Sequence, residues 1–221
     1  MTEKSSMLRK DIKQILCSLL SELDFYFEEK GFKRRKNGLI YTRKINTTIQ
    51  KIDMVFFSNP SYQQNALAHI YPHIQIFFPD VNNTAKIFSS NLIPEKWLNK
   101  FTIRQPIQIG SPSEDFFLKD ITNYKYLKME ILAFFEKYTM PLLENLTCAK
   151  DYLALYENKD QRIIWDNNQF LYVASAYFNK HELQTAYQVI EKRFGKSGLY
   201  RQYKEAFSFF EKSCETIKKS L

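Results

Sequence analysis

Apolar residues in the first 30 positions recur at intervals of three and four, the period of an amphipathic helix. The residues of this stripe are Leu8, Ile12, Ile15, Leu16, Leu19, Leu20, Leu23 and Phe27. Gly31 follows the last of them, and glycine is the residue that most often adopts the left-handed conformation at a helix end. The pattern predicts a helix over residues 7–29 that ends at Gly31.

After Gly31 the apolar positions alternate with polar ones, as in strands that are buried on one face. The pair Asn37-Gly38 predicts a two-residue hairpin turn. Strands are predicted over residues 39–46, 49–57, 70–78 and 101–110. The last is an edge strand, because Pro106 has no N–H to donate. SNPSYQQNA and PDVNNTA are expected to be polar loops, and a short helix is expected to begin at Pro94.

Beyond residue 115 the apolar spacing is helical. Helices are predicted over residues 119–138, 140–157, 167–178, 182–194 and 199–219. Within residues 167–194 the apolar and small positions match a tetratricopeptide-type helical hairpin, with Ala174 and Ala186 at the helix contact.

These elements together predict an α+β protein. An N-terminal helix packs on an antiparallel sheet of three to five strands, and an all-helical C-terminal half with one tetratricopeptide-like hairpin follows. The pattern predicts two domains, residues 1–113 and 114–221, and one continuous domain is the alternative.

Composition indicates a folded protein with reduced cysteines. Of the 221 residues, 44% are hydrophobic, enough for a sizeable core. Cys17, Cys148 and Cys214 are far apart and outside any Cys-x-x-Cys pair, which is typical of cytosolic thiols. The polar first residues lack the apolar run of a signal peptide, and no stretch has the ~18 apolar residues of a membrane span. We therefore expect a cytoplasmic protein without a membrane segment.

The basic charge of the chain is local. The formal net charge is +8, and residues 30–51 alone hold eight lysines and arginines and no acid. The remainder is close to neutral, unlike a protein that binds nucleic acid with its whole surface. The candidate binding face in this segment comprises Lys33, Arg34, Arg35, Lys36, Tyr41, Arg43, Lys44 and Lys51.

Three interpretations of this face remain open. It is a charged edge hairpin that discourages strand-on-strand aggregation, a docking face for an acidic protein, or a nucleic-acid patch in which Tyr41 stacks on a base. Each interpretation treats the cations as exposed. Reversal of Arg34, Arg35 and Arg43 to glutamate is therefore expected to leave the fold nearly intact.

Motifs for catalysis or metal binding are weak. His69 and His73 are four residues apart, which on a strand is ~13 Å and too far for one metal ion. Cys17 lies on the apolar side of the first helix and is expected to be buried. Glycine-rich phosphate loops and a GxSxG elbow are absent from the sequence. The acid-x-Lys pattern of a metal-dependent nuclease occurs at residues 28–30 and 157–159, but on predicted helices, so this function is a remote alternative. No catalytic residue, metal site or cofactor is predicted.

Three segments of the N-terminal half follow one another in a recognisable order. They are EEKGFKRRKNGLIYTRK, IQKIDMVFFSNP and YPHIQIFFP, between residues 10 and 110. In this order the chain resembles a family of bacterial domains of unknown function. The resemblance implies an α+β fold in a bacterial cytosol and transfers no catalytic residue. Small domains of this kind look like the immunity partners of bacterial toxins, which is an analogy of fold.

The leading hypothesis is a non-catalytic inhibitor that neutralises a toxin through protein–protein contact. The alternative is a nucleic-acid-binding accessory protein that uses the basic hairpin. If the toxin is itself a basic nuclease, the expected contact moves to the acids Glu114, Asp115 and Asp120.

Overall fold

The chain forms two compact units, and each unit is made of two separate segments. The computed structural model describes residues 8–89, 100–111, 115–120, 124–195 and 212. Residues 1–75 and 105–145 form the first unit, and residues 76–104 and 146–221 form the second. The sequence pattern, by contrast, favoured a division between residues 113 and 114. The combination of helices with an antiparallel sheet confirms the predicted α+β class.

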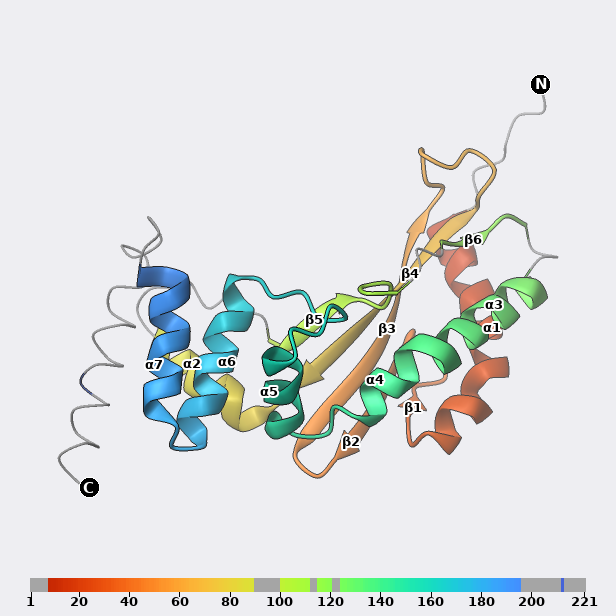
Figure 1. Ribbon diagram of the computed structural model, residues 1–221. Coiled ribbons are helices and arrows are strands. Elements are labelled where there is room, and N and C mark those ends of the chain that lie inside the picture. The colour runs from red at the N-terminus through yellow and green to blue at the C-terminus, as the bar shows by residue number, and fades with distance from the viewer. Residues whose placement is uncertain (1–7, 90–99, 112–114, 121–123, 196–211, 213–221) are drawn as a thin grey trace. The chain divides into compact units, whose positions relative to one another are not determined.

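A helix and a sheet begin the chain (Figure 1). Helix α1 spans Arg9–Glu29. The strands are β1 (Lys33–Arg34), β2 (Ile40–Ile45), β3 (Thr48–Ser58), β4 (Ala68–Phe77), β5 (Ile103–Pro106) and β6 (Phe116–Leu118). Their order is β1-β2-β3-β4-β5, and β6 pairs with β4. β6 lies beyond residue 113, in the part of the chain that was expected to be helical throughout.

Helix α1 ends where the sequence predicted. Gly31 has a φ of 78°, the left-handed region that favours glycine. The N–H of Phe32 donates to the carbonyl of Phe27 at 2.8 Å, and the N–H of Gly31 donates to that of Glu28 at 2.9 Å. These bonds close the helix end and turn the chain into β1.

One face of the sheet is the core of the first unit. Along β3, Ile52, Met54 and Phe56 are buried and alternate with half-buried residues. Phe27 of α1 packs on Tyr41 of β2, with ring centroids 4.1 Å apart. Each fully buried side chain of this size contributes about 1.5–3 kcal/mol of transfer free energy.

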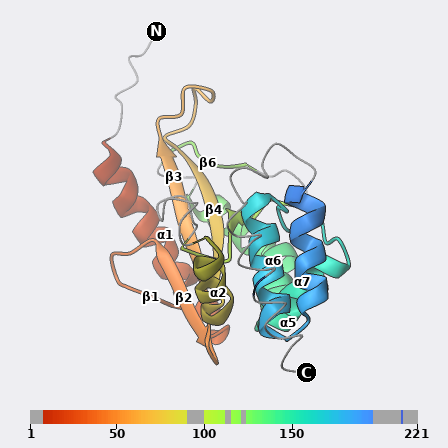
Figure 2. The ribbon, with the colours of Figure 1, turned by 90° about the vertical axis from the view of Figure 1, so that its left-hand side faces the viewer.

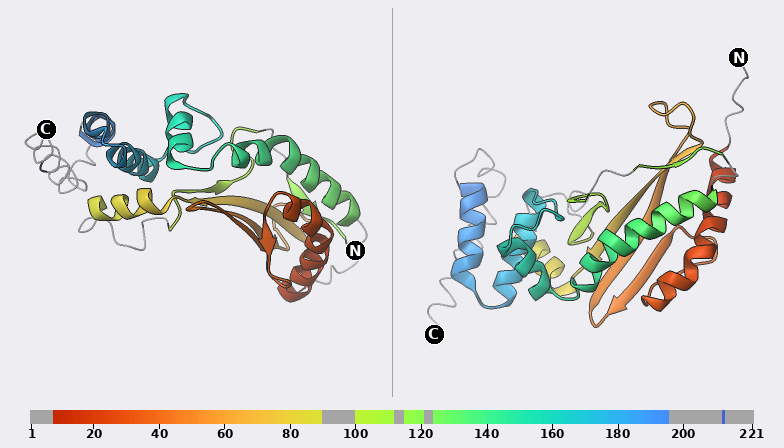
Figure 3. Two further views of the ribbon diagram at one scale, coloured as in Figure 1. Left: turned by 90° about the horizontal axis from the view of Figure 1, so that it is seen from below. Right: turned by 45° about the vertical axis from the view of Figure 1, so that its right-hand side comes forward.

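The helices that follow the sheet in the first unit run almost without interruption. α3 (Tyr124–Phe134) continues through a π-helical turn (Phe135–Thr139) into α4 (Met140–Glu144). Phe135 of the π-helical turn packs edge-on against Phe27 of α1, at 5.3 Å, and α3 also contacts α1, so the two helices lie side by side (Figure 3).

The helix boundaries predicted within residues 119–157 were wrong. The predicted boundary near residue 139 falls inside the α3–α4 run, and the predicted helix 140–157 is broken after α4. The break has a local cause, since Asp151 accepts the N–H groups of Thr147 and Cys148, and α5 (Ala149–Glu157) begins there.

The second unit is helical, and Figure 2 shows α5, α6 and α7 grouped together. α6 (Asn167–Asn179) and α7 (Leu183–Ile190) form the predicted hairpin, and a π-helical turn (Glu191–Gly195) follows. Ala174 and Ala186 are fully buried, as predicted. Small side chains at both positions let the helices approach closely.

The polar sequence PDVNNTA begins a helix and is not a loop. α2 spans Pro79–Ser89 and packs on α6. Pro79 suits a first helical turn, and Val81, Ala85 and Phe88 form the buried stripe. The expectation of a loop was wrong because the stripe is short and interrupted by asparagines.

Two predicted helices, the one from Pro94 and the one over residues 199–219, lie outside the described residues, apart from residue 212. No helix in the described parts of the chain is long and apolar enough to cross a membrane.

Candidate functional site

Arg34 of the basic segment lies in the interior of the first unit. Its guanidinium makes a bidentate pair with Asp24 of α1, from Nε to Oδ1 at 2.8 Å and from Nη2 to Oδ2 at 2.6 Å. Its side chain is 2% exposed. Nη1 donates to the carbonyls of Lys36 and Gly38, both at 3.0 Å. Arg34 therefore fastens the turn at residues 35–38 to α1.

Asp24 receives a second donor from the same face of the sheet. The Tyr41 hydroxyl lies 2.8 Å from Oδ1 of Asp24 and 2.9 Å from the carbonyl oxygen of Leu20. Burial raises the pKa of the Asp24 carboxyl, but the hydrogen bonds from Arg34 and Tyr41 outweigh it and hold that pKa below its usual value. Burial also raises the pKa of Tyr41, so its phenol stays protonated.

Arg43 is the second interior arginine. Nε donates to Oε1 of Gln50 at 2.7 Å, Nη1 donates to the carbonyl of Lys30 at 2.9 Å, and the guanidinium lies over the ring of Phe32. Burial lowers the pKa of Arg43, and the charge of Glu144 acts in the opposite direction. Arg43 satisfies the carbonyl at the end of α1, which is a structural role.

The hairpin keeps the predicted register but not the predicted turn. Lys33 pairs with Thr42 and Arg34 with Tyr41, and this register continued to the tip would pair Lys36 with Leu39. The strand pairing stops at Arg34, however, and the N–H of Gly38 donates to the carbonyl of Arg35 at 2.8 Å. The carbonyls near the tip turn inward to Arg34, which explains why the ladder ends early.

The eight residues of the predicted binding face therefore separate into two groups. Arg34, Tyr41 and Arg43 point into the core. The others lie at the surface or partly so: Lys33, Arg35, Lys36, Lys44 and Lys51. The premise of exposed side chains is wrong for Arg34 and Arg43, so we now expect their reversal to disturb the fold.

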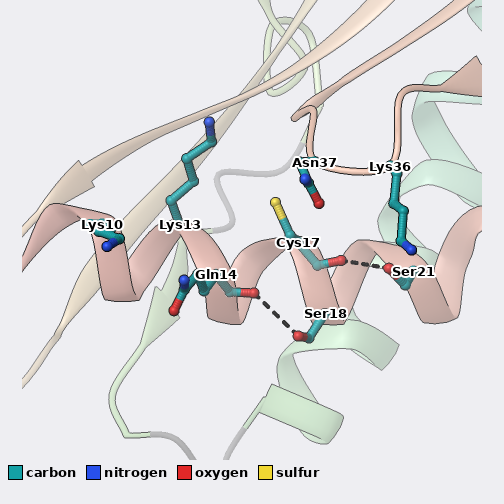
Figure 4. A pocket seen from close by; sticks show the side chains of 8 residues that line it. All are labelled: Lys10, Lys13, Gln14, Cys17, Ser18, Ser21, Lys36 and Asn37. Carbon is teal, nitrogen blue, oxygen red and sulfur yellow. Dashed lines mark hydrogen bonds between the residues drawn. The ribbon is translucent and has the colours of Figure 1, made fainter.

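Lys36 faces α1 across a pocket of about 460 Å³. Lys10, Lys13, Gln14, Cys17, Ser18 and Ser21 line it from the helix, and Lys36 and Asn37 line it from the turn. Figure 4 shows the three lysines around the opening and the sulfur of Cys17 directed toward Asn37. The lining holds three cations, hydroxyl and amide groups, and no carboxylate. We call this the lysine pocket.

The lysine pocket could have been found from the sequence in part. Its α1 residues recur at intervals of three and four, which marks a polar stripe beside the apolar one. What the sequence could not show is that Arg34 brings Lys36 onto that stripe. Cys17 was expected to be buried, but it is half-exposed in this pocket, because it lies at the edge of the apolar stripe.

The two strand histidines lie on the second face of the sheet. Nδ1 of His69 is 2.6 Å from the Tyr62 hydroxyl, and Nε2 is 3.3 Å from Oδ1 of Asp115. His69 and His73 both contact Tyr71 through their rings. Within the described residues, no group of three or more His, Cys, Asp or Glu is placed to hold a metal ion.

Among the described residues, no cluster is seen of the acids that were expected to meet a basic toxin. Asp115 lies beside His69, Asp120 is exposed, and Glu114 is outside the described residues.

Comparison with models of known families finds no match, and comparisons with curated proteins and with solved structures find none either.

Proposed function

We propose that this protein is a non-catalytic binding protein that docks an acidic segment of a protein partner at the lysine pocket. The observation that carries the proposal is the lining itself, three lysines without a carboxylate. Like charges held near one another favour an anion, and an acidic partner relieves their repulsion. An inhibitor that occludes a toxin, as the immunity-like resemblance implies, would use such a surface.

The geometry also explains why the pocket suits recognition better than the whole basic segment. Arg34 uses its donors internally and Arg43 is buried, so neither offers a bidentate pair to a partner. Within the part of the chain that the structure describes, Lys10, Lys13 and Lys36 are not committed in this way. The bidentate bond from Arg34 to Asp24 also fixes the turn, so Lys36 is held in place before a partner arrives.

The test is a binding titration with charge-reversed variants. A pull-down from native lysate followed by mass spectrometry supplies the partner, which is then purified. Lys10→Glu, Lys13→Glu and Lys36→Glu in one chain should weaken affinity by at least about tenfold, because attraction becomes repulsion. A matched control reverses Lys100, Lys125 and Lys150, which are exposed and outside the pocket. Equal losses in both variants would show that only net charge matters and would reject the pocket.

A second candidate function rests on the second face of the sheet, where His69 and His73 lie. Aromatic and imidazole rings contact one another there: Phe57, Tyr62, His69, Tyr71, His73 and Phe117. Phe57 is 49% exposed. Lys51 lies on the same face of β3 as Phe57, and through Thr42 it is in register with Lys33. Rings flanked by cations on an open sheet suit a single-stranded nucleic acid.

The salt dependence of binding distinguishes the acidic-protein function from the nucleic-acid function. Binding of a single strand should weaken with a log–log slope of about −0.7 per phosphate contact, so several contacts give a steep slope. Phe57→Ala should weaken that binding, and the lysine-pocket variant should weaken only the binding of an acidic protein. A steep salt dependence with sensitivity at Phe57 would favour the nucleic-acid function over the one proposed.

A further inference from the structure

The second unit contains a concave site with a different chemistry. A pocket of about 380 Å³ lies between the end of α5, the start of α6 and the turn that follows α7. Three aromatic side chains, Tyr156, Trp165 and Phe170, form its walls. The other lining residues are Glu157, Lys159, Lys192 and Arg193. We call it the aromatic pocket.

The rings of the aromatic pocket are fixed before any ligand arrives. Trp165 donates its indole N–H to the carbonyl of Asp160 at 3.0 Å. Tyr156 meets Trp165 edge-on, with centroids 5.4 Å apart, and meets Phe170 edge-on at 6.0 Å. Such T-shaped contacts hold ring planes in a defined orientation. A planar ligand would therefore meet a preformed surface, at little cost in side-chain entropy.

The charged groups of this pocket are mostly cationic. Lys159, Lys192 and Arg193 contribute three positive charges, and the guanidinium of Arg193 lies 5.0 Å from the centre of the Phe170 ring. The one acid of the lining, Glu157, accepts a hydrogen bond from the Tyr177 hydroxyl at 2.8 Å and keeps its negative charge, so the three cations still outnumber it. The balance favours an anionic group beside the rings.

Lys159 has an unusual backbone for its side chain. Its φ is 52°, in the left-handed region where glycine is favoured. It follows the end of α5, where the N–H of Asp160 donates to the carbonyl of Leu155 at 2.9 Å. Glycine would adopt this conformation with less strain. The chain therefore keeps a lysine, which places a cation at the pocket, where glycine would be less strained.

We infer that the aromatic pocket binds a small anion that carries a planar ring. Its volume lies within the range of small-molecule sites, and such sites combine apolar walls with a few polar groups that orient the ligand. The ring lies against Trp165 and Phe170, and the anionic group faces Lys159, Lys192 and Arg193. A nucleoside phosphate and an aryl carboxylate share this chemistry. The inference goes beyond the proposed function and does not depend on it.

Calorimetric titration of the intact protein tests the inference. The probes are adenosine 5′-monophosphate and indole-3-acetate, with adenosine and indole as their uncharged counterparts. We expect saturable binding of one or both anions, at least about tenfold tighter than the uncharged counterpart. The anion that binds more tightly shows whether the ligand is a nucleoside phosphate or an aryl carboxylate. Absence of saturable binding by either anion would overturn the inference, and so would equal affinity for charged and uncharged probes.

Lys159→Gly separates the pocket's function from its structure. The variant should keep or raise the melting temperature, because glycine relieves the strain, while anion affinity falls three- to tenfold with the loss of one cation. His181→Gly is the matched control: His181 has a φ of 62° at the end of α6 and does not line the pocket. It should keep or raise the melting temperature and leave affinity unchanged. Unchanged affinity in Lys159→Gly would overturn the assignment of the cation.

A third variant tests the rings. Trp165→Leu removes the flat wall and keeps an apolar side chain, so anion affinity should fall at least tenfold while the uncharged probes bind no better. An unchanged affinity would show that the probes bind elsewhere. All these readouts concern residues of the second unit, so they are independent of the variants of the lysine pocket.

Discussion

At the scale of single residues, charge alone does not report exposure. Arg34 belongs to the most basic stretch of the chain, yet its donors all find partners inside the first unit. An arginine can be buried at low cost when its fixed fork meets a carboxylate and free carbonyls at once. Asp24 supplies the carboxylate from a helix ten residues earlier, and the tip of the hairpin supplies the carbonyls.

Asp24→Asn should destabilise the protein by about 3 kcal/mol at neutral pH, because Arg34 would keep its charge without its ion-pair partner. The folded pKa of Asp24 is depressed, so its stabilisation is complete above the unfolded value of about 4 and is lost as the pH falls through the folded value. Urea unfolding at several pH values measures this. The difference between the variant and the parent should shrink below about pH 4.

Glu29 is exposed, and Glu29→Gln is the control for the unfolding measurements on Asp24→Asn. It should change stability by less than about 0.5 kcal/mol at every pH. A constant difference between Asp24→Asn and the parent down to pH 2 would contradict the assigned ion pair.

Cys17 offers a test of the lysine pocket that needs no partner. In a chain with Cys148→Ser and Cys214→Ser, the Cys17 thiol should react in the folded state, because it is half-exposed. The dianionic reagent dithiobis(nitrobenzoate) should react at least about threefold faster at low salt than at 0.5 M salt, since salt screens the attraction of the lysines. An uncharged maleimide should show no such salt dependence. If salt leaves the rate with the dianionic reagent unchanged, the pocket carries no local positive potential.

At the scale of elements, a long hydrophobic period predicted helices and strands well. Elements whose period is short or interrupted were missed. The long stripe of α1 and the alternation of β3 predicted both elements to within two residues of their ends. α2 was missed because three buried residues are too few to establish a period among asparagines. The start of α5 was missed because it depends on the side chain of Asp151, which caps the helix from within its first turn.

The candidate sites were predictable to a smaller degree than the elements. The sequence identified the basic segment, but the partners of its arginines come from α1 and β3, and no local pattern shows them. The lysine pocket joins residues about 20 positions apart. The aromatic pocket joins the ends of three helices, and Lys159 appeared in the sequence only as part of an unspecific acid-x-Lys pattern.

The hairpin of α6 and α7 gives a prediction about packing. Ala174→Leu should overpack the contact with α7 and cost roughly 1–3 kcal/mol, because Ala174 is fully buried. The matched control, Gln184→Leu on the exposed side of α7, should change stability by less than about 0.5 kcal/mol. Thermal or denaturant unfolding measures both. A stable Ala174→Leu variant would mean that the two helices do not meet there.

At the scale of the whole molecule, the two units cannot be separated by one cut. Residues 76–104 belong with the segment that starts at residue 146, so a chain that ends at Asn145 retains α2 without α6. Val81, Ala85 and Phe88 would then lose their cover. We expect such a truncated chain to bind a hydrophobic dye strongly and to aggregate, whereas the full chain does neither. Dye fluorescence and sedimentation check this, and a monomeric truncated chain that binds no dye would contradict the interleaved division.

The same interleaving sets an order of events during synthesis. A chain leaving the ribosome completes its first unit once residue 145 has emerged, but α2 emerged earlier and still awaits α6. At about 5–20 residues per second, α2 waits several seconds with its apolar stripe uncovered. Its asparagines and its acidic first turn keep the remainder of that helix hydrated meanwhile. The polar character that concealed α2 in the sequence thus serves the nascent chain.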